Sequence, residues 1–150
     1  MLLLGFRALD KFYISGKVYS NKLENPIDIF FLIDTGASKT QLSWNEAQKN
    51  GIDIRKLPQD SRISTGIGGS VRGYILSNSY IIFNGLRGTL NFKINNLRVS
   101  DYETVDKKRA PSIPSLLGID FLKGFNILFD NDVVYLKRNT VIPKNSSDGF

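Results

Sequence analysis

The sequence predicts an all-β protein, a closed barrel with one or two short helices. Short segments rich in β-branched and aromatic residues recur along its 150 residues, with turn-forming residues between them. Helical patterns are confined to a few short stretches, which argues against a helical or α/β architecture. A chain of this size can bury one core, so we expect a single domain over residues 1–138 and a polar, flexible tail over residues 139–150.

The first predicted element is a hairpin. Residues 11–19 and 27–33 have the composition of strands, and the segment between them, SNKLENP at 20–26, has the composition of a turn. Toward its end, over residues 30–33, the second strand loses its alternation of apolar and polar residues. Such a loss is typical of a strand that is buried on both faces.

A short helix and a second hairpin follow. The helix is expected over residues 43–50, where Ser43 and Glu46 have the spacing of a capping box. Residues 61–76 have strand-like ends around three glycines, which suit a flexible hairpin tip: Gly66, Gly68 and Gly69.

The remaining elements are also mostly strands. We expect strands at residues 79–83, 89–94 and 96–99, a turn at Asn84–Gly85, and a loop over residues 101–114. The chain then gives a strand end at SLLG, a short helix over Asp120–Lys123, a turn at Gly124, and a closing hairpin through Asn131–Asp132.

The charge does not by itself identify a partner. The formal net charge of +6 would suit nucleic acid, but the basic residues are mostly scattered. The one basic run, at residues 107–109, lies beside prolines and suits a solvated loop. We expect no nucleic-acid partner, and we keep a basic β-barrel that binds nucleic acid by aromatic stacking as an alternative.

The absence of two residue types narrows the chemistry. The sequence contains no cysteine and no histidine, which excludes Ser-His-Asp and Cys-His nucleophiles, HExxH zinc sites and cysteine metal sites. An enzyme of this composition would use carboxylates as acid and base, so we expect no metal and no cofactor. No apolar run approaches bilayer length, and we expect a cytoplasmic protein without a membrane partner.

Asp34, Thr35 and Gly36 stand directly after the apolar run of the second strand. An unpaired carboxylate is expensive in a buried place, so an acid at this position needs an explanation. A turn or a backbone cap would explain the three residues alone equally well.

The wider context favours catalysis. Asp-Thr-Gly-Ala at residues 34–37, a short helix, the glycine-rich tip at 66–69 and LLGIDFL at 116–122 occur in this order. Over residues 27–136 this arrangement resembles the retropepsin-like aspartic proteases. It is most similar to their cellular branch, which includes the protease domain of the DNA-damage-inducible ubiquitin-shuttle proteins.

The resemblance implies a role for each motif. The catalytic loop would consist of Asp34, Thr35 and Gly36. A glycine-rich flap and the residues after the catalytic loop would contact substrate: Ala37, Ser38, Gly66, Ile67, Gly68 and Gly69. A second apolar loop would brace the first with Leu116, Leu117 and Gly118.

Two positions depart from the viral members of the family. Those commonly have Asp where this chain has Ser38, and Arg where it has Ile119. Both charged partners are replaced together, so neither leaves the other unpaired. Asp120 is a second acid near the site, for which we favour a role at the start of the following helix over pairing with Asp34.

The motif occurs once, and one carboxylate cannot serve as base for water and as acid for the peptide. The resemblance therefore implies a half-site in each chain, completed in a homodimer that hydrolyses peptide or protein substrates. Residues 1–6 and 133–136 are candidates for a sheet between subunits, as in viral relatives. The first alternative is a catalytically silent module of the same fold that binds peptides by strand addition.

Overall fold

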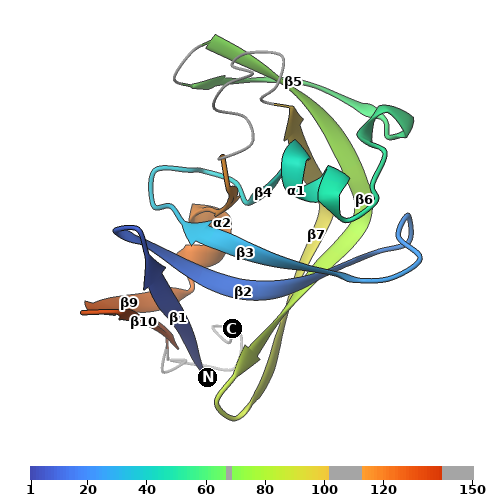
Figure 1. Ribbon diagram of the computed structural model, residues 1–150. Helices are drawn as coiled ribbons and strands as arrows, with labels where there is room; N and C mark the ends of the chain where they lie inside the picture. Colours follow the sequence, from blue (N-terminus) through green and yellow to red (C-terminus); the bar gives the residue numbers. More distant parts are fainter. Residues whose placement is uncertain (67–68, 102–112, 140–150) are drawn as a thin grey trace, which may run out of the picture.

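The computed structural model describes residues 1–66, 69–101 and 113–139, which are mostly strand (Figure 1). The strands are β1 (Leu2–Ala8), β2 (Lys11–Ser20), β3 (Ile27–Ile33), β4 (Gln41–Ser43), β5 (Gln59–Gly66), β6 (Gly69–Gly85), β7 (Gly88–Asp101), β8 (Ser115–Leu117), β9 (Phe125–Asp130) and β10 (Val133–Arg138). The helices in these ranges are α1 (Trp44–Lys49), the 3-10 turn η1 (Ile54–Lys56) and α2 (Ile119–Leu122). The predicted all-β class with short helices is confirmed.

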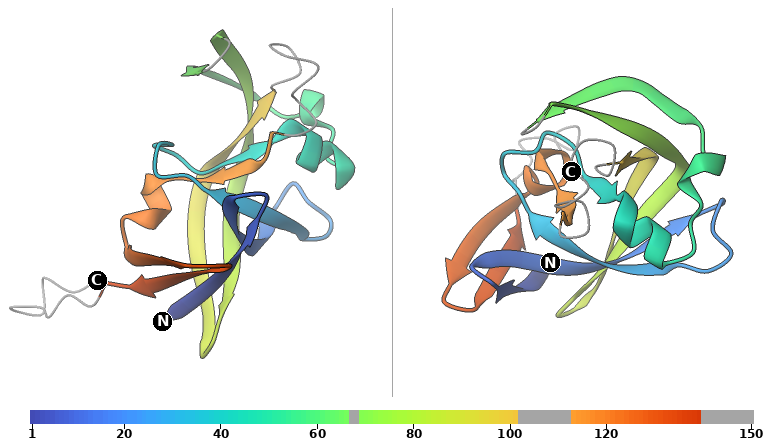
Figure 2. Two further views of the ribbon diagram at one scale, coloured as in Figure 1. Left: turned by 60° about the vertical axis from the view of Figure 1, so that its left-hand side comes forward. Right: turned by 45° about the horizontal axis from the view of Figure 1, so that its top comes forward.

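The sheet closes into a barrel because β6 pairs with strands on both of its sides. Along one side β6 pairs with β7, and its residues 79–82 pair with residues 17–20 of β2 on the other. The ring runs β6–β7–β4–β8–β3–β2 and back to β6. Strand β5 extends from the ring at one end and the β1–β10–β9 ribbon at the other (Figure 2). The predicted closed barrel is therefore confirmed.

The inward-facing side chains form one apolar core. Its largest fully buried members come from every strand of the ring and from β1 and β10 beside it: Leu3, Val18, Ile29, Phe31, Leu42, Leu76, Ile81, Phe83, Leu97, Val99, Leu117 and Leu136. Helix α2 joins this core through Phe121, whose ring centroid lies 4.8 Å from that of Phe83. Burial of each such side chain contributes about 2 kcal/mol, so the core fixes where α2 and β8 lie against the barrel.

Strand β3 corrects one prediction. Its side chains alternate between buried and exposed along most of its length, and Phe30 is 58% exposed. The apolar run over residues 30–33 does not indicate burial on both faces, because Phe30 packs edge-to-face against Phe6 on the outer face of the sheet, with their ring centroids 5.4 Å apart. The outer face therefore carries aromatic residues of its own.

Several predicted boundaries are confirmed and others shift. The first hairpin and the closing turn at Asn131 appear where they were predicted. Helix α1 lies within the predicted residues 43–50, and α2 begins and ends one residue earlier than the predicted Asp120–Lys123. The turn expected at Asn84–Gly85 instead uses Leu86 and Arg87, because Gly85 still pairs with Gly88. The predicted strands from 79 to 99 belong to two long strands, β6 and β7, and the prediction lacked β1 and β4 as separate strands.

The two ends of the described chain pair with each other. Strand β1 lies antiparallel to β10, with Leu3 opposite Leu136 and Leu4 opposite Tyr135. The segments that were candidates for a sheet between subunits are thus already joined within one chain.

Some predicted features fall outside the described residues: Ile67 and Gly68, most of the loop at 101–114, and the tail from residue 140 onward. Within the described ranges, no helix has the length and apolar character needed to cross a bilayer.

Candidate active site

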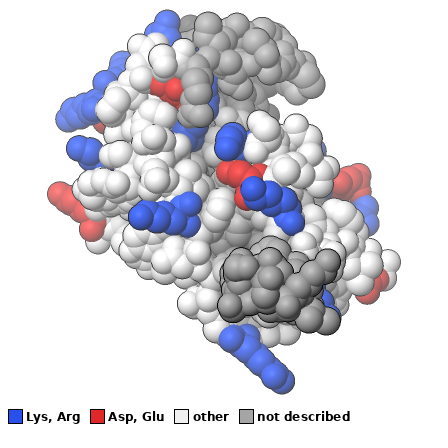
Figure 3. Space-filling model, turned by 180° about the vertical axis from the view of Figure 1, so that it is seen from behind, with Lys and Arg blue, Asp and Glu red and all other residues white. Residues whose placement is uncertain are grey.

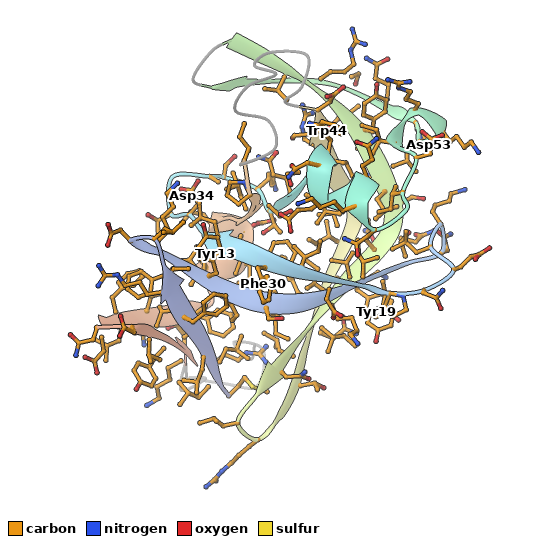
Figure 4. All side chains as sticks on the ribbon, viewed as in Figure 1. Tyr13, Tyr19, Phe30, Asp34, Trp44 and Asp53 are labelled. Atoms are coloured by element: carbon orange, nitrogen blue, oxygen red, sulfur yellow. The ribbon has the colours of Figure 1, made fainter. Side chains whose placement is uncertain are left out.

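Asp34 lies at the start of a tight loop that leaves the end of β3 (Figure 4). Its Oδ1 accepts the N–H of Gly36 at 2.9 Å, and its carbonyl accepts the N–H of Ala37 at 3.2 Å. A Cβ on Gly36 would stand 3.2 Å from the same carboxylate oxygen, so glycine leaves room for it. Asp34 is half-buried, whereas Thr35 and Gly36 are exposed in the single chain. The loop thus presents the carboxylate at the surface.

The segment joining β8 to α2 holds this loop from behind. The N–H of Asp34 donates to the carbonyl of Leu117 at 3.1 Å, and the N–H of Ile119 donates to the carbonyl of Ala37 at 2.8 Å. A Cβ on Gly118 would lie 2.7 Å from the carbonyl carbon of Lys39 and 2.8 Å from the oxygen of Ala37. Because these are backbone atoms, only glycine permits so close an approach.

The two leucines before Gly118 differ in environment. Leu117 is fully buried in the core, and Leu116 is half-buried, opposite Leu32 of β3 and Gln41 of β4. Strand β8 therefore lies between the strands that lead into and out of the loop.

Asp120 and Thr40 form a polar brace that the sequence did not reveal. The Asp120 carboxylate accepts the N–H of Thr40 at 3.0 Å and its hydroxyl at 2.7 Å. The Thr40 hydroxyl in turn accepts the N–H of Gly118 at 3.0 Å. The expected role of Asp120 at the start of α2 is only partly right: it accepts the N–H of Phe121, but its other hydrogen bonds are directed to Thr40.

The predicted capping box is replaced by a bridge between α1 and β8. The side chain of Ser43 does not cap the helix; its hydroxyl donates to Oε1 of Glu46 at 3.2 Å. The same oxygen accepts the N–H of Ser115 at 2.8 Å. Glu46 therefore ties the helix to the strand that supports the Asp34 loop.

The glycine-rich hairpin is formed by β5 and β6. Gly66 pairs with Gly69 at the described end of the ladder, and Thr65 pairs with Ser70. In the views of Figures 1 and 2, this end of the hairpin lies on the same side of the molecule as the loop after β3. The structure brings the two predicted motifs to one side, although Ile67 and Gly68 are not among its described residues.

The charges near the surface do not gather in a stripe on the face shown in Figure 3. Lys and Arg side chains are dispersed there, with acidic side chains among them. Among the described residues, no group of three or more acidic side chains is arranged to hold a metal ion. The chemistry this site offers is that of one half-buried carboxylate oriented by a backbone N–H.

Comparison with known proteins identifies related chains. Residues 21–121 match the family model described as aspartyl protease. A curated, uncharacterised protein of Rickettsia prowazekii (strain Madrid E) is 32% identical over an alignment of 127 residues that covers 81% of this chain. The chain spans about half, 47%, of the length of that relative.

Two solved structures are similar to this fold. A retropepsin-like aspartic protease from Rickettsia conorii has 26% identity and a TM-score of 0.54, with 91% of this chain and 90% of that chain covered. The EIAV protease, solved with an inhibitor, has 15% identity and a TM-score of 0.46, with 74% and 84% covered. The Rickettsia conorii structure supports the predicted retropepsin-like fold.

Proposed function

Since the chain belongs to the aspartyl protease family, we propose that it is an endopeptidase whose active site forms when two copies bring their Asp34 side chains together. The observation that carries the proposal is the Asp34-Thr35-Gly36 loop, which is braced from behind and open in front. The cellular branch of the retropepsin-like family is the subgroup we propose for it.

The need for a second copy follows from the chemistry. Hydrolysis requires one group to take a proton from water and another to give a proton to the peptide. The sequence holds a single Asp-Thr-Gly, and the exposed Thr35 and Gly36 leave this side of the loop open to a partner. A two-fold axis beside the loop would supply an identical carboxylate.

The two carboxyl groups would share one proton. Like charges within hydrogen-bond distance cannot comfortably both ionise, and the aspartic protease dyad is the established example of this behaviour. The ionised Asp34 would take a proton from a water molecule as that water attacks the scissile carbonyl carbon. The protonated Asp34 of the second copy would polarise the carbonyl oxygen and afterwards help protonate the leaving nitrogen.

The neighbouring residues would position these groups. The N–H of Gly36 already orients the Asp34 carboxylate, and Thr35 would hydrogen-bond across the dimer to hold the two loops together. Leu116, Leu117 and Gly118 would keep the loop from receding when substrate binds.

The β5–β6 hairpin would act as a flap over the substrate. Ala37, Ser38 and the glycine-rich end of the hairpin would contact the peptide backbone, and closure would exclude bulk water. The glycines at and beside the tip, including Gly66 and Gly69, would supply the freedom to open.

A cleavage assay tests this function. Purified protein is incubated with an unfolded protein substrate at mildly acidic pH, and Asp34→Asn is compared with wild type. We expect the loss of both proton-transfer carboxylates, one from each copy, to reduce the rate by at least about 100-fold. Asp53→Asn is the control, because Asp53 is an exposed acid that only caps η1 and lies far from Asp34 in Figure 4.

The same assay separates the alternative. A silent peptide-binding module would give equal, background cleavage with wild type and Asp34→Asn while still retaining peptide in a binding measurement. Equal cleavage in the two proteins would therefore contradict the proposed protease.

A further inference from the structure

A buried guanidinium lies at the root of the β5–β6 hairpin. Arg98 of β7 has a side chain that is only 10% exposed, and its Nη1 donates to Oδ2 of Asp60 at 2.9 Å. Its Nη2 donates to the carbonyl oxygen of Val71 at 2.6 Å. Asp60 belongs to β5 and Val71 to β6, so one side chain holds both strands of the hairpin.

These contacts lie on either side of an interruption in the ladder. Asp60 pairs with Gly73, but the next pair outward is Ser64 with Val71, so three residues of β5 face a single residue of β6. Such an irregularity bends a strand and weakens its pairing locally. The guanidinium contacts Asp60 on the inner side of the interruption and Val71 on the outer side. It therefore bridges the place where the hairpin is least supported by backbone pairing.

Gly73 provides the space for this bridge. A Cβ there would lie 2.3 Å from Cζ and 2.5 Å from Nη1 of Arg98. Because β6 lies between β5 and β7, the arginine must pass over this position to reach Asp60. A glycine in the middle of a long strand is otherwise unfavourable, and here its missing side chain leaves room for the guanidinium of Arg98.

The bridge continues toward the catalytic loop. Nε of Arg98 donates to the hydroxyl of Ser100 at 3.1 Å, and that hydroxyl donates to Oε1 of Gln41 at 2.7 Å. Gln41 opens β4, the strand into which the Asp34 loop leads. A continuous polar chain therefore joins the hairpin root to the strand after the loop.

We propose that Arg98 is a positioning residue that sets the angle of the hairpin above the Asp34 loop by clamping Asp60 and Val71 across the interrupted ladder. The clamp itself is a property of this chain, whereas its effect on substrate rests on the proposed protease function. A planar guanidinium has several donors in fixed directions, which suits a carboxylate, a carbonyl and a hydroxyl that lie at different points around it. Lysine keeps the charge but has no such fork, so it should restore the clamp incompletely.

Hydrogen exchange of backbone amides tests the clamp without requiring activity. Arg98→Met and Arg98→Lys are compared with the protein that has Arg98. All three proteins carry Asp34→Asn, so that cleavage cannot contribute to the exchange. We expect exchange to rise about tenfold in Arg98→Met over residues 64–66 and 69–71, with an intermediate rise in Arg98→Lys. Exchange in β2, β9 and β10 should change by less than about twofold.

The control is the exposed pair formed by Lys17 and Asp28 at 3.8 Å. Lys17→Met removes a charge from a barrel strand as Arg98→Met does, and we expect no change in the hairpin. Asp60→Asn, which keeps the shape of the side chain, serves if Arg98→Met fails to fold and should raise exchange over the same residues. A uniform rise through all strands, or no rise in the hairpin, would overturn the proposal.

With active protein, the clamp predicts a particular kinetic effect. A hairpin held at the wrong angle should weaken substrate binding, so KM should rise several-fold in Arg98→Lys while kcat changes less. An equal loss in kcat at unchanged KM would contradict a positioning role. If wild type shows no cleavage, the protease proposal fails, and the exchange experiment still decides whether the clamp exists.

Discussion

The Asp34 loop and the root of the β5–β6 hairpin are held in different ways. The loop is fixed by a series of backbone hydrogen bonds to the segment around Gly118. Hydrogen bonds of Thr40 with Asp120 and Gly118 add a second support. The hairpin has an interrupted ladder, and Arg98 bridges the break. The contrast teaches that the loop is supported along its backbone, whereas the hairpin depends at its root on the contacts of one side chain.

Gly118→Ala should have the largest effect, because it disrupts the backbone contacts that support the Asp34 loop. The new methyl would meet the backbone of Ala37 and Lys39, which cannot move aside without shifting the loop. We expect a loss of about 3 kcal/mol in the free energy of unfolding and a displaced Asp34. Denaturant unfolding measures the loss. Gly124→Ala is the matched control, since its nearest contact would be an ordinary 3.6 Å, and an equal loss there would contradict the argument.

Asp120→Ala should have the next largest effect. It removes the acceptor of the Thr40 N–H and hydroxyl, and hydrogen bonds to a charged acceptor contribute about 2 kcal/mol. We expect a comparable loss of unfolding free energy. Thr40→Val should lose less, because it retains the backbone N–H bond. If the double variant lost the full sum of the two effects, the two residues would not form one brace.

Gly73→Ala tests whether the root of the β5–β6 hairpin can be disturbed without a change in the Asp34 loop. Its methyl would collide with the guanidinium of Arg98 and push it away from Asp60, so the clamp would be broken. Because part of the cost of separating a buried ion pair is added to that of the methyl, we expect a loss of about 2 kcal/mol in the free energy of unfolding. We expect amide exchange to rise over residues 64–66 of β5 and 69–71 of β6 and to stay unchanged near Asp34. Faster exchange around the Asp34 loop would show that the two regions are not independent.

Lys17→Met should have the smallest effect. The pair with Asp28 is exposed and 3.8 Å long, and such pairs contribute about 0.5 kcal/mol or less. We expect no measurable change in thermal unfolding, which gives the baseline for the other variants. A loss of unfolding free energy as large as that of Asp120→Ala would show that this exposed ion pair stabilises the barrel more than its exposure to solvent predicts.

The features that the sequence predicted are those with local signals. Asp-Thr-Gly, the closing turn at Asn131 and the apolar segment before Gly118 are each visible in a few adjacent letters. Their order along the chain sufficed for the barrel and for the proposed catalytic loop.

The contacts that tie these motifs together could not be predicted in the same way. Thr40 and Asp120 are distant in sequence, and nothing near either one indicates the other. Arg98 stands between two apolar residues in the one stretch of β7, residues 97–100, that is buried on both faces, where a charge has a cost unless it is paired. The useful signal was the combination of that arginine with a glycine in the middle of β6, which is a property of the packed sheet.

The central claim is that two chains each supply one Asp34 to a shared site, and subunit mixing tests it most directly. Wild type and Asp34→Asn are mixed in equal amounts under dilute conditions that allow exchange, then concentrated, and mass measurement of tagged chains verifies that mixed dimers form. We predict that activity per wild-type chain falls to about one half, because half of those chains would be paired with an inactive partner. Undiminished activity per wild-type chain in the presence of mixed dimers would contradict the account.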